Sequence, residues 1–310
     1  MAFATTIDRQ KGIITLQDTL TGTEADIFIF GGMLNAFRIR TGNDTVNVVD
    51  GFASPDEARE HLFERFKGAK LSPFVCRLYQ GNYSFEGKEY HITGHFLNGH
   101  AIHGLVLSEN FRPDAYGNND DAAFVTLVYD YEGTDTGYPF PYKLQVRWEL
   151  GRDNMLSVVT NVIHHNSHSI PYTDGWHPYF TLGGMIDECN LQFDSDRCHE
   201  FSEDLIPTGK VFKDARFLNG HSLKEIDLDN SFRMEGGKGR CRLYNDVLEV
   251  TVHPDENYPI LQLYIQPNRK SIAIENLSGP PDNFNNGIDL LTLTPGVEKI
   301  FTTRYSVKLL

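Results

Sequence analysis

The chain has 310 residues, with 28 lysines and arginines against 42 aspartates and glutamates, a formal net charge of −14 and a hydrophobic fraction of 40%. Nucleic acids and anionic membrane surfaces are bound through clustered Lys and Arg, and because the sequence contains no such cluster, this acidic balance argues against both partners. The length fits one large β domain or two small domains. The 21 phenylalanines and 14 tyrosines supply enough apolar area for a sizeable core, which excludes a disordered chain.

The N-terminal segment contains Asp8, Arg9 and Lys11 and no apolar stretch of secretory length, and nowhere do about 18 consecutive apolar residues occur. We therefore expect neither a signal peptide nor a membrane span. The four cysteines form no C-x-x-C pair, which argues against a zinc ribbon or a redox dithiol. We expect reduced, buried thiols in a cytoplasmic protein, while the spacing of Cys189 and Cys198 leaves a disulfide open.

Short segments of strand-like composition recur from the N-terminus to the C-terminus. They cover residues 25–30, 35–40, 45–49, 123–129, 247–252, 260–265, 271–275 and 300–308.

One helix is predicted after the first three of these segments. It begins at Ser54, which has the residue type of an N-cap, and Pro55 and Glu57 supply the first helical proline and the capping-box carboxylate. Ala58 and Leu62, followed by a phenylalanine four residues later, place an apolar stripe on one face.

Two hairpins are well defined by their patterns. The segment 83–90 is interrupted by a turn sequence at 86–88, and residues 142–150 alternate between apolar and polar without error before a turn at 151–154 and a second alternating run over 156–162. No strand–helix–strand repetition implies a parallel sheet, and no linker or internal repeat divides the chain. We predict an all-β fold, a large antiparallel β-sandwich in which residues 1–310 form a single domain.

Twelve histidines raise the question of a metal site, because eight of them lie between residues 91 and 177. The pairs His91/His95 and His100/His103 have spacings that align ligands on a helix, whereas this stretch is predicted as strand and turn. A metal-dependent isomerase of the cupin kind therefore rests on histidine density alone, and we expect neither a metal nor another cofactor.

Nucleophilic hydrolysis finds little support, since the sequence has no G-x-S-x-G and no paired Asp/Glu signature of a glycosidase. Three separated segments instead place ionisable side chains where an ordinary strand or turn does not need them: residues 98–104, 173–180 and 271–276.

In the last of these segments, Ile272 and Ile274 point to one face of a strand, so Ala273 and Glu275 point to the other. The small Ala273 leaves room beside the Glu275 carboxylate, which makes it a candidate general base. An isolated glutamate at this place is also compatible with a solvated strand end.

His177 lies among aromatic residues, with Trp176 before it and Tyr179 and Phe180 after Pro178. A turn here would expose the ring beside stacking surfaces of the kind that sugars prefer. Taken alone, the residue fits a satisfied core histidine better than a catalyst.

In order and spacing these segments resemble the aldose 1-epimerase (galactose mutarotase-like) family through most of the chain. The matching motifs are 74–83 with the following hairpin 85–90, His103-Gly104, Gly137-Tyr138-Pro139, His177-Pro178-Tyr179-Phe180, 228–232 and Ala273-Ile274-Glu275. Each is weak alone, but six in this order form a specific signal. The resemblance implies a β-supersandwich and an isomerase that interconverts the α and β anomers of a free aldohexose without a cofactor.

The resemblance also implies catalytic roles by position. Glu275 would be the general base that removes the proton of the C1 hydroxyl, and His177 would be the general acid that protonates the ring oxygen. The ring opens to the aldehyde, rotates about C1–C2 and closes to the other anomer. His103 would orient the sugar near the ring oxygen.

The implied substrate-binding residues are Arg77 and Asp229, which would bind hydroxyls, together with Trp176. From the residues alone, Arg77 and Asp229 are also compatible with a structural salt bridge and a turn. The expected partner is a small-molecule sugar, with no nucleic acid and no membrane, and the expected assembly is a monomer or a homodimer.

The sequence departs from the family pattern beside three of these positions. Leu105 follows His103-Gly104 where many members have glycine, Trp176 and Pro178 flank His177, and Asn276 follows Glu275. These departures retain the acid and the base, but they leave the identity of the sugar open. They also leave open a carbohydrate-binding protein on the same fold that has lost turnover. They also leave a hexose-6-phosphate 1-epimerase open, which would need cations near the site; the candidates are Arg38, Arg40, Lys67, Lys70 and Arg77. The acidic total charge favours a neutral sugar.

Overall fold

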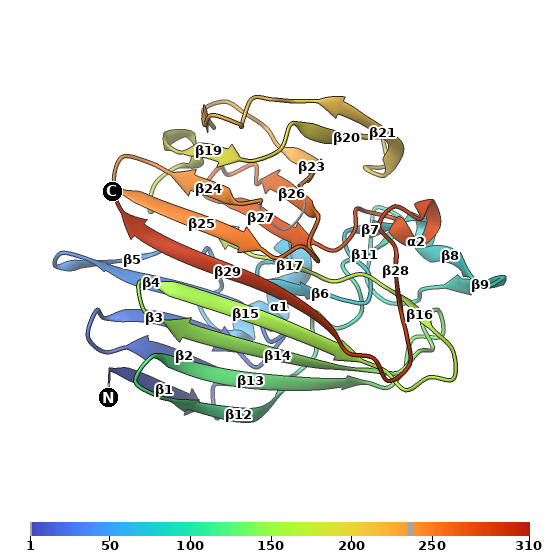
Figure 1. The fold of residues 1–310 in the computed structure, drawn as a ribbon, viewed down its shortest axis with the longest axis horizontal. Helices are drawn as coiled ribbons and strands as arrows, with labels where there is room; N and C mark the ends of the chain where they lie inside the picture. The colour runs from blue at the N-terminus through green and yellow to red at the C-terminus, as the bar shows by residue number, and fades with distance from the viewer. Residues whose placement is uncertain (1, 235–238) are drawn as a thin grey trace.

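The computed structural model describes residues 2–234 and 239–310, and these residues form antiparallel β-sheets with few helices (Figure 1). The largest sheet has nine strands, in the spatial order β12 (Arg112–Asn118), β13 (Ala122–Tyr131), β14 (Tyr142–Gly151), β15 (Met155–Ile163), β29 (Lys299–Leu309), β25 (Leu248–Pro254), β24 (Cys241–Tyr244), β19 (Asn190–Phe193) and β22 (His221–Ser222). The second sheet has eight strands, in the order β21 (Pro207–Lys213), β20 (Arg197–Phe201), β23 (Asp229–Arg233), β26 (Ile260–Ile265), β27 (Ile272–Leu277), β17 (Gly175–His177) and β6 (Ala69–Leu71), with β18 (Tyr179–Phe180) also paired to β27.

The N-terminal segment forms a third, five-stranded meander, with β1 (Phe3–Asp8), β2 (Ile13–Asp18), β3 (Thr23–Phe28), β4 (Leu34–Thr41) and β5 (Asp44–Asn47) in chain order. A three-stranded sheet has the order β10 (Phe96–Leu97), β11 (His100–Ile102) and β7 (Arg77–Leu78), and two further pairs join β16 (Ile170–Tyr172) to β28 (Leu291–Leu293) and β8 (Asn82–Phe85) to β9 (Lys88–His91). The helices are α1 (Pro55–Arg65) and α2 (Asn283–Asn286), with 3₁₀ turns η1 (Tyr79–Gly81) and η2 (Ile186–Glu188).

The long hairpin β14–β15 shows why the sheets pack as a sandwich. Alternate residues of β14 are buried, as the period-two pattern predicts, and Trp148 pairs with Val158 across the hairpin. The Trp148 ring meets Trp176 of β17 at 5.3 Å between centroids, so the nine-stranded sheet faces the eight-stranded one. The indole N–H of Trp148 donates to the Gly32 carbonyl at 2.9 Å, which connects the nine-stranded sheet to the N-terminal meander. The predicted all-β antiparallel sandwich is confirmed.

Helix α1 begins as its sequence predicts. The Ser54 hydroxyl accepts a hydrogen bond from the Glu57 N–H at 3.1 Å, and Pro55 is the first helical residue. Ala58 and Leu62 are fully buried, so the apolar stripe packs against the sheets. The helix ends at Arg65 and is capped by Phe66, which adopts a left-handed conformation with φ of 55° and turns the chain toward β6.

Candidate active site

A pocket of about 580 Å³ lies against the eight-stranded sheet and gathers most of the predicted site residues. His177 and Glu275 line it from β17 and β27, and His103 lines it just after β11. Arg77 of β7 and Asp229 of β23 complete its polar wall. The structure therefore brings together five residues from five separate parts of the chain.

Glu275 reaches the pocket because of strand alternation. Ile272 and Ile274 point into the core, whereas Glu275 lines the pocket on the opposite face, as predicted. Only 2% of the Glu275 surface is exposed. Its Oε1 atom lies 3.4 Å from Nε2 of His177, and its Oε2 atom has no hydrogen-bond partner.

His177 is placed by the short strand β17, which pairs with β6 on one side and with β27 on the other. The residue is 5% exposed, and its Nδ1 atom has no hydrogen-bond partner in the described part of the chain. The Tyr179 ring lies 5.0 Å from the imidazole, between ring centroids. With Nε2 directed at Glu275, the histidine is buried but remains open to a ligand in the pocket.

His103 occupies a strained turn. It has a left-handed φ of 60°, and Gly104 follows with φ of 83°, where an added Cβ would overlap the Ser72 carbonyl. The His103 N–H donates to the Cys76 carbonyl at 2.9 Å. This turn sets the ring perpendicular to that of His177, with 5.0 Å between the two centroids. Its Nδ1 atom is buried and has no hydrogen-bond partner among the described residues.

Arg77 and Asp229 supply opposite charges beside the acid–base pair. The Asp229 Oδ1 atom accepts a hydrogen bond from Gln262 Nε2 at 2.9 Å, which fixes the carboxylate on the pocket wall. Within the described part of the chain, the Arg77 guanidinium forms no ion pair closer than 4.0 Å. Its positive charge nevertheless opposes the rise in the pKa of both Asp229 and Glu275.

Burial shifts the pKa of both members of the pair toward the uncharged form. Desolvation lowers the pKa of His177 from 6.5 to about 4. Desolvation, followed by repulsion from Asp229, raises the pKa of Glu275 well above 4.5. Burial and the nearby His177 and Arg77 lower the pKa of His103 well below 6.5, so this ring stays neutral.

These shifts define the proton content of the empty pocket. Both shifts favour the uncharged form of each group, so burial favours a His177–Glu275 pair that holds one proton on the carboxyl group and has no net charge. Transfer of that proton across the 3.4 Å contact gives an imidazolium and a carboxylate, which are a general acid and a general base side by side.

Strand β26 and the residue that follows it add three pocket residues that the sequence analysis missed. Gln262, Tyr264 and Gln266 alternate toward the pocket. The Gln266 side chain is buried beside Tyr179, and its hydrogen bonding to the phenol opposes the rise in the Tyr179 pKa that burial causes. The alternation of the predicted strand 260–265 was the signal for this shared face.

The C-terminal end of α1 forms another part of the wall that was missed. Glu64, Arg65 and Phe66 line the pocket, and the Phe66 ring packs on His103 with 4.6 Å between centroids. Arg65 forms no ion pair among the described residues. The helix thus contributes a second arginine to the pocket, opposite in charge to Asp229.

Trp176, the sixth predicted site residue, is not brought into the pocket. On β17 it points away from His177 and packs in the core against Trp148, with 2% of its surface exposed. The ammonium of Lys70 lies 4.7 Å from its ring centroid and bonds to Asp174 at 2.6 Å. The tryptophan is thus part of the packing behind His177.

The cations considered for a phosphate site are mostly committed elsewhere. Arg38, Lys67 and Lys70 each pair with carboxylates, and Arg40 does not line the pocket. Arg77 is the member of that set that reaches the site.

Three further expectations concern metals, thiols and membranes. Within residues 2–234 and 239–310, no group of three or more His, Cys, Asp and Glu side chains is arranged to hold a metal ion. All four cysteines are buried free thiols, and Cys189 and Cys198 are not joined. None of the helices in the described residues has the length and apolar character of a membrane span.

Solved structures establish the fold class. A galactose mutarotase-like protein from Clostridium acetobutylicum superposes with a TM-score of 0.84 at 17% identity, covering 99% of this chain and 98% of that one. A galactose 1-epimerase from Lactobacillus acidophilus superposes with a TM-score of 0.81 at 20% identity, covering 96% of this chain and 94% of that one. An aldose epimerase homologue from C. elegans superposes with a TM-score of 0.82 at 20% identity, covering 94% of this chain and 97% of that one. The fold is that of the galactose mutarotase-like proteins.

The sequence comparison is more specific. The model of the aldose 1-epimerase family matches residues 12–306, and the chain belongs to that family. It is also 30% identical over 248 residues to the uncharacterized protein YihR of Escherichia coli (strain K12), covering 74% of this chain and 75% of that protein.

Proposed function

We propose that the protein is an aldose 1-epimerase that interconverts the α and β anomers of a free aldohexose in the cytoplasm. The observation that carries this proposal is the 3.4 Å contact between His177 and Glu275 in a pocket that also presents Arg77 and Asp229. Membership of the family supports an isomerase, and four free thiols support a reducing compartment.

The proposed reaction needs one proton to leave the sugar and one to enter it. The Glu275 carboxylate takes the proton of the C1 hydroxyl while the His177 imidazolium gives its proton to the ring oxygen. The C1–O5 bond breaks and the C1 carbonyl forms. After rotation about C1–C2, the same two groups return the protons in the reverse sense and close the ring to the other anomer. Each positioned transfer contributes about 10²–10⁴-fold.

The other pocket groups act on the remainder of the sugar. His103, held neutral by burial, orients the substrate near the ring oxygen, and Arg77 and Asp229 bind hydroxyls. The side-chain amide of Gln266, which also lines the pocket, supplies a further polar contact. Arg77 also stabilises Glu275 as a carboxylate at the moment it acts as a base.

The direct test is anomer exchange. Freshly dissolved α-glucose and α-galactose should equilibrate faster with the protein than without it, measured by polarimetry and by exchange NMR. Sugar binding in calorimetry without faster exchange would refute the proposal and favour a binding protein on the same fold.

A sugar with an anionic substituent is a second candidate substrate. Arg65 and Arg77 both line the pocket, and neither forms an ion pair among the described residues. Guanidinium groups bind phosphate strongly. A panel of free hexoses and hexose 6-phosphates decides between the candidates: a kcat/KM at least 10-fold higher for the phosphates, lost selectively in Arg65→Gln, would favour the anionic sugar.

A further inference from the structure

The turn between β26 and β27 forms a boundary between two cavities. Gln266, Pro267 and Asn268 line the active-site pocket, whereas Lys270 lines a separate cavity of about 800 Å³. Arg269 lies between them in a left-handed conformation with φ of 53°, which is strained for a residue with a side chain. Such a conformation persists only where surrounding contacts hold it.

The backbone of Arg269 is fixed on both sides. Its N–H donates to the Gln266 carbonyl at 2.9 Å, which closes the turn, and its carbonyl accepts from the Ile186 N–H at 2.9 Å, which ties the turn to η2. Asn268 adds a local contact, since its side-chain oxygen accepts from the Lys270 N–H at 3.1 Å.

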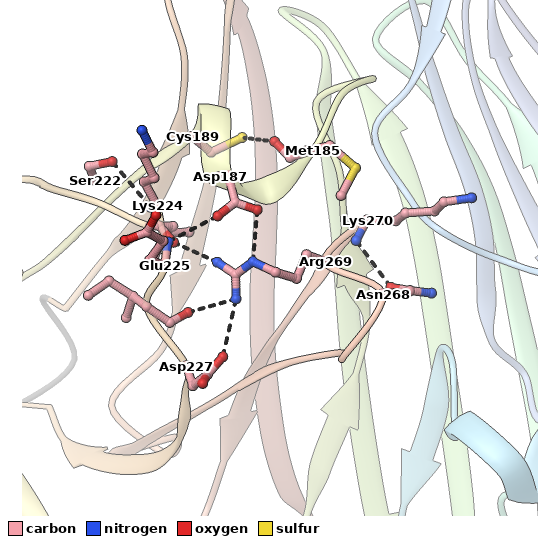
Figure 2. Close-up of polar contacts among 12 residues, drawn as sticks. Met185, Asp187, Cys189, Ser222, Lys224, Glu225, Asp227, Asn268, Arg269 and Lys270 are labelled. Carbon is pink, nitrogen blue, oxygen red and sulfur yellow. Dashed lines mark hydrogen bonds and ion pairs between the residues drawn. The ribbon is translucent and has the colours of Figure 1, made fainter.

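The guanidinium of Arg269 bonds to two segments, η2 and residues 223–227 (Figure 2). Nε donates to Asp187 Oδ2 at 2.8 Å, and Nη1 donates to Asp227 Oδ1 at 3.2 Å. Two backbone carbonyls complete the set, those of Leu223 at 2.7 Å and Ile226 at 3.0 Å. The planar fork of arginine can reach all four acceptors at once, whereas a lysine ammonium has three donors on a single atom.

These contacts join two walls of the active-site pocket. The segment 223–227 leads directly into β23, which begins at Asp229, and the Ile265 N–H donates to the Leu228 carbonyl at 3.0 Å beside it. The guanidinium therefore fixes the segment that leads into Asp229, while the backbone of the same residue fixes the turn that contains Gln266. We call the hydrogen bonds and ion pairs of Arg269 to these two walls the Arg269 clamp. Glu275 and His177 are paired with each other and make none of these contacts, so the proton-transfer pair lies outside the clamp.

We propose that Arg269 is a positioning residue that sets the spacing between the Asp229 wall and the Gln266–Asn268 wall of the sugar pocket. This inference rests on the proposed function, because it assigns the clamp to sugar binding rather than to proton transfer. Loss of the clamp weakens the binding of the sugar hydroxyls and leaves the rate of ring opening in the bound sugar nearly unchanged.

The test compares Arg269→Ala and Arg269→Lys with the wild type in α-galactose and α-glucose exchange. We expect KM to rise about 10-fold in Arg269→Ala while kcat stays within about 3-fold, with a smaller rise in Arg269→Lys. Asp227→Asn should leave KM within about 2-fold, because the Asp227 side chain is fully exposed and such ion pairs contribute little. Arg216→Ala is the matched control, since Arg216 pairs with Asp214 outside the pocket.

An unchanged KM in both Arg269 variants, or a loss of kcat at constant KM, would overturn the clamp. If Arg269→Ala does not fold, Arg269→Lys carries the same comparison. If the wild type binds galactose without accelerating exchange, the proposed function fails, and the clamp is then judged by the ratio of galactose Kd values in calorimetry. A ratio of about 10 supports it and a ratio near 1 overturns it.

Discussion

Nε2 of His177 lies 3.4 Å from Oε1 of Glu275, on neighbouring strands of one sheet. Each group is buried in a setting that disfavours its charged form, yet the two together can move a single proton between them. Removal of either partner therefore tests the chemistry more directly than any change in the pocket wall.

We expect Glu275→Gln and His177→Asn each to lower kcat by about 10²–10⁴-fold with a smaller change in KM, because each removes one proton-transfer group. The double variant should be little worse than the poorer single variant, since the two residues act as a unit. Exchange NMR with α-galactose measures both parameters. Wild-type rates in either variant would exclude the acid–base assignment.

The pH dependence of kcat/KM should lack a step near the ordinary histidine pKa. The active pair holds one proton, and a second proton adds to His177 only as the pH falls through about 4, which leaves no base. Activity should therefore stay level from neutral pH down to about pH 5 and decline below it. At the alkaline end it should decline when Glu275 loses the proton that burial retains. A limb centred near 6.5 in polarimetric rates would contradict the neutral pair.

Glu275→Gln should be more stable than the wild type by an amount that grows with pH. The folded pKa of Glu275 is raised, so its favourable contribution is complete below about pH 4.5 and is lost as the pH rises toward the folded pKa. Within that window the gap should widen by up to about 1.4 kcal/mol per pH unit. Urea unfolding of both proteins at pH 5.5 and 7.5 measures it. Parallel stabilities at the two pH values would show that the carboxyl group is already ionised in the folded protein.

Trp176→Phe should leave KM for the sugar within about 2-fold, because the tryptophan packs in the core behind the site. We expect a loss of stability of about 1–3 kcal/mol, because the smaller ring fills less of the core and forms a weaker cation–π contact with Lys70. Thermal unfolding and exchange kinetics on the same sample separate the two effects. A large rise in KM at unchanged stability would return this residue to the sugar-binding set.

Asp174→Asn should destabilise the fold by about 3–5 kcal/mol. The Asp174 carboxylate pairs with the fully buried Lys70 and accepts the hydroxyls of Tyr172 and Tyr258, so its loss leaves a buried ammonium without a counter-charge. Burial already lowers the pKa of Lys70, and the deficit should shrink at alkaline pH as the lysine is neutralised. Urea denaturation at pH 7 and pH 9, with the exposed-site variant Asp227→Asn as control, provides the comparison.

The strand pattern made most of the fold predictable. Perfect alternation over 142–150 placed Trp148 on the buried face, and Ser54 with Pro55 marked the start of α1. The same rule predicted the face of Glu275, because Ile272 and Ile274 identify the core side. Local pattern sufficed wherever a strand was long enough to show its period.

The rest of the site depended on information that no local pattern holds. Trp176 and His177 lie on a three-residue strand, too short to show that neighbours face opposite ways, so both were expected beside the sugar. Gln266 shares a face with Gln262, but the sequence does not show which face meets the pocket. Arg65 reaches the site only because α1 ends beside His103, which is a matter of tertiary packing.

The near-complete burial of His177 and Glu275 has a consequence for how the reaction relates to its surroundings. Under the proposed mechanism, every proton that the sugar gives to the pair is matched by one that the pair gives back, so a complete cycle exchanges none with the bulk. The centre can work closed off from water, and its turnover should be indifferent to the concentration of buffer in which it is measured.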